Sequence, residues 1–211
     1  MNSPDLFIAP YESEYPLDER PEDRTVEGVL LRRWAGEPTG PQQWGAHRTR
    51  RQFEVMGASP PRCAGCEGPA HRDERGALWI LHTPGTRLTG SLAGPILVTT
   101  PPVCLTDAAR AVQSCTAVHE GAVALRVTEA EVVGVRGTVY SPIAPPVRNE
   151  IVRFDDPRAE RVIADALVRE ISCAEADTTT LPSLTSARAR GSRCPTSGTA
   201  VTSAPSPASC V

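Results

Sequence analysis

Two cysteines three residues apart, in the glycine-rich segment "PRCAGCEGPA", constrain the fold of this chain most. A Cys-x-x-Cys turn, here Cys63 and Cys66, lets one tight loop present two thiolates to the same metal ion. Structural zinc takes four Cys, His or carboxylate ligands arranged as a tetrahedron. Gly65 and Gly68 suit a turn whose backbone bends back toward the sulfur atoms. The sequence therefore predicts half of a zinc site here.

The second half is expected at "PPVCLTDAA", where residues 105–115 are predicted to form a short helix. Cys104 stands at the helix start, where the macrodipole favours a thiolate, and Asp107 follows at the Cys-x-x-ligand spacing. Cys115 lies about 16 Å further along a helix that rises about 1.5 Å per residue, so one ion cannot contact both Cys104 and Cys115. The predicted ligands of a structural Zn²⁺ ion are Cys63, Cys66, Cys104 and Asp107.

The fourth ligand stays open at this point. Asp107 could serve only as a helix cap, because Asp and Thr near a helix start commonly bind free backbone N–H groups. Three histidines then compete for the fourth position, His71, His82 and His119, and His82 is the best placed because it ends a predicted strand. The remaining cysteines have no ligand-like spacing. Cys115 is expected to pack as a small apolar residue.

Composition divides the chain into three parts. Residues 1–55 lack sustained periodicity and carry opposed charges, so we expect a disordered leader, in which "HRTRR" could also be a binding arm. Residues 56–173 hold the cysteine motifs and the apolar runs, and are predicted to form the folded domain. Residues 174–211 are rich in Ser, Thr, Pro and Ala, and are expected to be disordered. Met56 is a possible alternative start of translation.

Within the central domain the patterns predict an α+β fold. "DERG" is a turn between two short strands, and "DDPRAERVIADALVREI" has a capping Asp156, a proline at the first helical position and apolar residues on one face. The predicted elements are a β-hairpin at 69–82, strands at 96–100, 122–128, 131–140 and 149–154, and an amphipathic helix at 155–171.

The overall charge and hydropathy exclude several classes. All 22 basic residues are arginine and the formal net charge is −3, which offers no general attraction to nucleic acid and favours a protein partner. No signal peptide is evident. The sequence also has no run of about 18 apolar residues, the length that a membrane-spanning helix needs. We therefore expect a reducing, cytoplasmic location, where Cys-x-x-Cys is more typical of a metal or redox motif than of a disulfide.

The order of a knuckle, a hairpin and a second ligand pair at a helix start resembles that of treble-clef zinc folds. Over residues 61–171, "CAGCEGPA", "DERGALWIL" and "PPVCLTDAA" resemble small uncharacterised zinc-knuckle proteins of actinobacterial genomes and mobile elements. The resemblance implies a zinc-knuckle domain and brings no known activity. Two positions depart from the pattern: Glu67 replaces a knuckle glycine, and Asp107 stands where the resemblance places a fourth cysteine.

Catalytic motifs are missing or out of order. A zinc deaminase needs His-x-Glu before Pro-Cys-x-x-Cys, whereas "VHEGA" follows the candidate cysteines and places Glu120 directly beside His119. A thioredoxin-like pair should open a helix, whereas "CAGC" leads into Gly and Pro. The sequence therefore predicts a non-enzymatic, zinc-stabilised binding domain. The alternative is a zinc-dependent or redox enzyme that uses Cys63 and Cys66.

Overall fold

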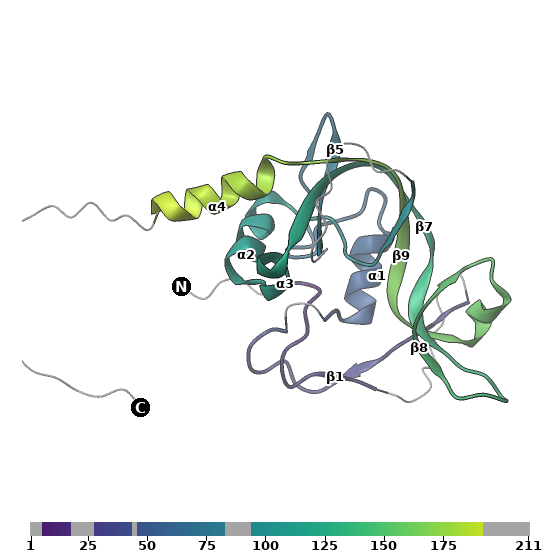
Figure 1. The fold of residues 1–211 in the computed structure, drawn as a ribbon. Coiled ribbons are helices and arrows are strands. Elements are labelled where there is room, and N and C mark those ends of the chain that lie inside the picture. Colours follow the sequence, from purple (N-terminus) through teal and green to yellow (C-terminus); the bar gives the residue numbers. More distant parts are fainter. Residues whose placement is uncertain (1–5, 18–27, 44–45, 83–93, 192–211) are drawn as a thin grey trace, which may run out of the picture.

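The computed structural model describes residues 6–17, 28–43, 46–82 and 94–191, and shows a mixed α+β fold, the class predicted from the sequence (Figure 1). In chain order its elements are β1 (Tyr15–Pro16), β2 (Leu30–Leu31), β3 (Trp34–Ala35), α1 (Thr49–Gly57), β4 (Arg72–Asp73), β5 (Gly76–His82), β6 (Ile96–Val98), α2 (Leu105–Ser114), α3 (Thr116–Glu120), β7 (Ala122–Val139), β8 (Val147–Arg153), the 3₁₀ helix η1 (Pro157–Arg161), β9 (Val162–Ala176) and α4 (Thr180–Gly191). Within the described ranges, no helix is both long and apolar enough to cross a membrane.

Two long strands, β7 and β9, form the centre of the main sheet. They pair antiparallel along most of their length, and the strand order is β2-β9-β7-β5-β4, with β6 also paired to β9 and β8 to β7. β2 runs parallel to β9, and the other pairings in this sheet are antiparallel. β1 and β3 form a separate two-stranded sheet.

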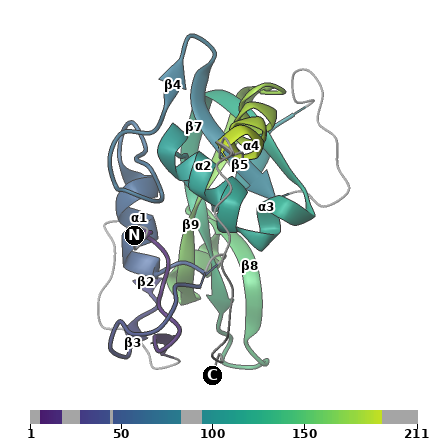
Figure 2. The same ribbon diagram turned by 90° about the vertical axis from the view of Figure 1, so that its left-hand side faces the viewer.

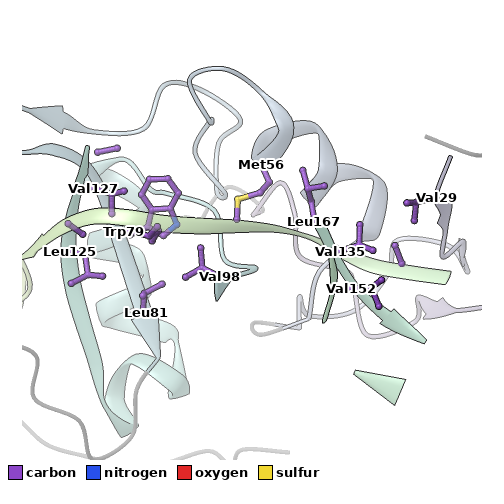
Figure 3. Packing of buried hydrophobic residues seen from close by; sticks show 14 of the residues in the cluster. Val29, Met56, Trp79, Leu81, Val98, Leu125, Val127, Val135, Val152 and Leu167 are labelled. Atoms are coloured by element: carbon purple, nitrogen blue, oxygen red, sulfur yellow. The ribbon is translucent and has the colours of Figure 1, made fainter. Parts of the chain in front are cut away.

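Strand β5 is buried on both faces. Trp79 and Leu81 point into the larger core cluster together with Met56 of α1 and Leu125 of β7 (Figure 3). Leu78 and Ile80 point the opposite way, toward a smaller cluster that includes Ala108 of α2. Figure 2 shows that α2, α3 and α4 gather near β5, away from α1. The sheet therefore has apolar cover on both faces here, which explains the unbroken apolar run "ALWIL".

Helix α1 corrects the prediction that residues 1–55 form a disordered leader. The helix packs against β9. Its Gln52 has no exposed surface and forms hydrogen bonds with β9 and with the loop after β6. The Gln52 side-chain amide donates to the Thr99 and Leu167 carbonyls at 2.7 and 3.0 Å and accepts from the Leu167 N–H at 2.8 Å. Arg169 of β9 donates to the Met56 carbonyl at 2.7 Å, which satisfies a free C=O at the end of α1.

The prediction of an amphipathic helix at 155–171 is wrong. Asp156 and Pro157 do start a helix, and the Asp156 carboxylate accepts from the Arg158 N–H at 2.8 Å, but only the 3₁₀ helix η1 forms. The chain then continues as strand β9. Residues on both faces of β9 are buried. A strand that is covered on both faces has a nearly continuous apolar sequence. Periodicity alone does not separate that pattern from a buried helix.

Other predictions were closer to the structure. The hairpin at 69–82 is confirmed as β4 paired with β5, and the strands at 96–100 and 149–154 correspond to β6 and β8. The two strands predicted at 122–128 and 131–140 are one strand, β7, and the expected break between them is an irregularity in its register with β9.

The tail predicted from residue 174 onward is wrong where the structure describes it. β9 continues to Ala176, and α4 follows at Thr180–Gly191. The part of this prediction that covers residues 192–211, with Cys194 and Cys210, lies outside the described residues, as do residues 1–5, 18–27 and 44–45 of the predicted leader.

Candidate metal centre

The four predicted ligands lie together. One donor atom from each of Cys63, Cys66, Cys104 and Asp107 lies within 4.8 Å of the other three. The Cys66 and Cys104 sulfur atoms are 3.9 Å apart, and Asp107 Oδ2 is 3.2 Å from the sulfur atoms of both Cys63 and Cys104. A tetrahedral zinc ion with Zn–S bonds of about 2.3 Å holds its sulfur ligands about 3.8 Å apart, so the donors fit such an ion.

A tight turn presents the first pair of donors. The Cys63 N–H donates to the Gly68 carbonyl at 2.8 Å, and the Glu67 N–H donates to the Cys63 carbonyl at 3.1 Å. Glu67 has a φ of 61°, a left-handed conformation that glycine adopts more easily. Glu67 thus adopts a backbone conformation that is more typical of glycine. An ion pair of 2.8 Å between Arg62 and Glu67 accompanies it.

The start of α2 and the loop before it present the second pair. The Ala64 N–H donates to the Pro102 carbonyl at 2.9 Å, which joins the knuckle to this loop. The Cys104 N–H points to the Cys63 sulfur at 3.2 Å, and the Asp107 N–H points to the Cys104 sulfur at 3.4 Å. Each of these two sulfur atoms thus accepts from a backbone N–H at the start of α2.

Asp107 does not cap α2, because Cys104 occupies the N-cap position. The carboxylate of Asp107 is buried and accepts from the Cys63 and Cys104 thiols and from Arg110, whose guanidinium is 2.6 Å away. Gly65 makes room for it, since a Cβ there would lie only 2.7 Å from Asp107 Oδ1. The turn at Cys63–Cys66 therefore passes so close to the Asp107 carboxylate that a side chain at position 65 would overlap it.

The electrostatics of the site suit a cation. Burial raises the pKa of the Cys63 thiol above its usual range, although backbone N–H groups oppose this shift. Burial and the neighbouring Asp107 also raise the pKa of Cys104. Burial alone would raise the pKa of Asp107, but hydrogen bonds from Cys63, Cys104 and Arg110 lower it. A divalent cation would supply the positive charge that deprotonated thiols need in this buried place.

The competing histidines lie outside the cluster. His71 Nδ1 is 2.8 Å from the Arg126 guanidinium, and His119 Nε2 is 2.8 Å from the Val112 carbonyl. His82, the strongest histidine alternative, is not a member of the group either. Cys115 is half-buried at the junction of α2 and α3, and Cys173 is exposed.

A segment near the N-terminus, which no sequence motif indicated, covers the Cys63–Cys66 turn. The Phe7 and Ile8 N–H groups donate to the carbonyls of Gly65 and Ala64 at 2.8 and 3.3 Å. Arg51 of α1 holds this segment by donating to the Phe7 carbonyl at 2.9 Å. The first two contacts join backbone atoms and the third ends on a backbone carbonyl, so the short apolar run at 6–9 was the one feature of the sequence that could have indicated them.

A second polar cluster, also missed, joins β7 to the start of α4. Arg126 donates to the Asp177 carboxylate at 2.7 Å and lies 3.1 Å from the Thr180 hydroxyl. The Asp177 carboxylate also accepts from the N–H groups of Thr179 and Thr180, both at 3.0 Å, at the start of α4. These contacts fix the sheet to the start of α4, and the polar groups of the cluster bond one another.

No protein-family model matches this chain, and no match was found among curated proteins or solved structures. The function is therefore inferred from the residues of the site itself.

Proposed function

We propose that this chain is a non-enzymatic binding domain stabilised by a structural Zn²⁺ ion held by Cys63, Cys66, Cys104 and Asp107. The observation that carries the proposal is the convergence of these four donor atoms within 4.8 Å. They come from two distant segments, and the knuckle is in turn bonded to the segment at residues 6–9. A bound ion would therefore join parts of the chain that are far apart in the sequence.

A structural role is favoured over a catalytic one by the ligand count. Catalytic zinc keeps one position open for water or substrate, whereas structural zinc is closed by four protein ligands. Here four protein donors are present, and the second carboxylate oxygen of Asp107 is engaged by Arg110. The residues after Cys63 form a turn and no helix, an arrangement that also disfavours thioredoxin-like redox chemistry.

A treble-clef-like arrangement and kinship with the actinobacterial zinc-knuckle proteins are part of this proposal. The treble-clef-like arrangement is supported by the order of three elements along the chain: the Cys63–Cys66 turn, the β4–β5 hairpin and the start of α2. A protein partner is favoured over nucleic acid because the chain has a net charge of −3 and because the β7–β8 hairpin exposes Ile143, Val147 and Ile151. A reducing compartment such as the cytoplasm suits zinc-binding thiols.

Metal analysis together with thermal unfolding tests the zinc proposal. We expect the purified full chain to contain one zinc per chain and to melt at a lower temperature after a chelator such as EDTA removes it. Cys104→Ser should lose the zinc, and Cys115→Ser, a matched change at the other end of α2, should retain it. Protein without stoichiometric zinc, whose melting does not respond to the chelator, would contradict the proposal.

Fluorescence anisotropy with labelled double-stranded DNA and single-stranded RNA tests the class of partner. We expect no saturable binding by the zinc-loaded chain at physiological salt, because it lacks the excess of cations that phosphate binding requires. Saturable binding that weakens as salt rises would shift the proposal to nucleic acid.

A further inference from the structure

A cavity of about 460 Å³ lies between the segment at residues 6–9, the sheet and the helices α2 and α3. Pockets that hold small molecules have volumes of about 300–1,000 Å³, with mostly apolar walls and a few polar groups. Its apolar wall includes Leu6, Ile8, Ile80, Val103, Ala111 and Val118. Its polar lining includes His47, Thr99 and Arg136. Both the size and the lining suit a small ligand.

The unusual group in this lining is the guanidinium of Arg136, which projects from β7. Its Nε is buried and has no hydrogen-bond partner in the described part of the chain. One terminal nitrogen lies 3.5 Å from the Thr99 hydroxyl, the outer limit of a hydrogen bond. A buried donor without an acceptor is costly, and Nε is such a donor although Arg136 as a whole is half-buried. Arg136 is therefore suited to receive an anionic acceptor.

The carboxylates near this cation already have partners. Asp107 lines the same cavity but is engaged by Arg110 and by the cysteine thiols. Arg136 also lines an adjacent cavity of about 300 Å³, and the carboxylate there, Asp165, is paired with Arg32. Among the described residues, no ion pair neutralises Arg136.

His47 lines both cavities beside Arg136 and adds no negative charge. Burial, helped by the positive charge of Arg136, lowers the pKa of His47 to about 4. The imidazole is therefore neutral at pH 7 and can bond a ligand oxygen or nitrogen. Among the described residues, the half-buried Arg136 thus has no ion-pair partner at the edge of this apolar wall.

We propose that this cavity binds a small organic anion, with an apolar body against Ile8, Ile80 and Val118 and a carboxylate on the guanidinium of Arg136. An Arg fork matches the two oxygens of a carboxylate, and such charge-assisted bonds are stronger where water is excluded. The site borders the proposed metal centre, because Ala64 and Asp107 line the cavity, but its anion-binding group is Arg136 and not a zinc ligand.

Calorimetric titration of the zinc-loaded full chain with decanoate and with decan-1-ol tests this inference. The two probes share an apolar chain and differ in charge. We expect decanoate to bind one site per chain at least about tenfold more tightly than decan-1-ol, the factor that a charge-assisted hydrogen bond supplies. This comparison uses the wild-type chain and does not depend on whether a variant folds.

Arg136→Met should remove the preference for decanoate and leave the weaker binding of decan-1-ol unchanged. The exposed Arg158→Met serves as the matched control and should retain the preference. Absence of decanoate binding, equal affinity for the two probes in the wild type, or an unchanged preference in a folded Arg136→Met variant would each overturn the inference. Zinc content measured on the same samples keeps this result separate from the metal proposal.

Discussion

Cys63 and Asp107, 44 positions apart in the sequence, meet with the sulfur atom 3.2 Å from a carboxylate oxygen. This contact joins the knuckle to the first turn of α2. It also decides between the two roles that the sequence left open for Asp107, because the N-cap position of the helix is occupied by Cys104. Asp107 is therefore available as the fourth donor of a three-sulfur, one-oxygen centre.

Asp107→Asn should lower the affinity for zinc by at least about tenfold, because an amide is a much weaker ligand than a carboxylate. Asn has nearly the same shape and also suits helix starts, so the helix itself should be retained. Competition with a chromogenic chelator measures the affinity, and circular dichroism checks the helix. Asp156→Asn, a cap far along the chain, is the control. Equal zinc affinity in Asp107→Asn and wild type would mean that Asp107 is not a ligand.

Gly65→Ala should impair the metal centre although no ligand is changed. The added methyl group would overlap the Asp107 carboxyl group, and such overpacking typically costs about 1–3 kcal/mol. We expect a weaker zinc affinity and a lower melting temperature. Gly57→Ala is the matched control, because its Cβ would lie at an ordinary 3.5 Å from Leu167. If both variants retain the wild-type zinc affinity, Asp107 does not need the position that the structure gives it.

Gln52→Ala should destabilise the fold by about 2–3 kcal/mol, because it leaves the buried Leu167 N–H and two carbonyls without their partner. Urea unfolding measures the free energy. Gln113→Ala, at an exposed site on α2, is the control and should change it by less than about 0.5 kcal/mol. A similar small change in both variants would show that the contact between α1 and β9 contributes little.

The buried Asp177 carboxylate should make the fold sensitive to acid. Burial alone would raise its pKa, but hydrogen bonds from Thr180, Thr179 and Arg126 lower it below the usual range. The folded state then binds fewer protons than the unfolded state, so this stabilisation is present above about pH 4 and is lost as the pH falls further. We expect the free energy of unfolding to fall more steeply with acid in the wild type than in Asp177→Asn.

Acid titration of the unfolding free energy, followed by the fluorescence of the three tryptophans, gives both slopes. Asp177→Asn should also be less stable than wild type at pH 7. The exposed Glu160→Gln variant should keep the wild-type slope. A wild-type slope in Asp177→Asn would rule out this carboxylate as a source of acid sensitivity.

The sequence predicted the candidate site better than it predicted the fold. Cys63 and Cys66, and Cys104 and Asp107, are two local pairs whose spacing follows from ligand geometry, and the structure confirms that the pairs meet. That they bind zinc stays a prediction. The hairpin at 69–82 was also predictable, because its turn residues act locally.

The elements that were missed depend on contacts between distant segments. The sequence of β9 predicted a helix because both faces of this strand are buried. Such a strand lacks the alternation of apolar and polar residues that identifies a strand with one exposed face. Helix α1 lacks a capping side chain, and Gln52 and the Arg169 side chain bond it to β9, which is distant in the sequence. Arg126 and Asp177 are 51 positions apart, so no local pattern relates them.

Zinc K-edge X-ray absorption on the protein as purified tests the central claim most directly. A centre of Cys63, Cys66, Cys104 and Asp107 predicts three sulfur neighbours at about 2.3 Å and one oxygen at about 2.0–2.2 Å from the metal. The Asp107→Cys variant, loaded with zinc, should give four sulfur neighbours. A shell of nitrogen and oxygen alone, or the absence of bound metal, would contradict the claim.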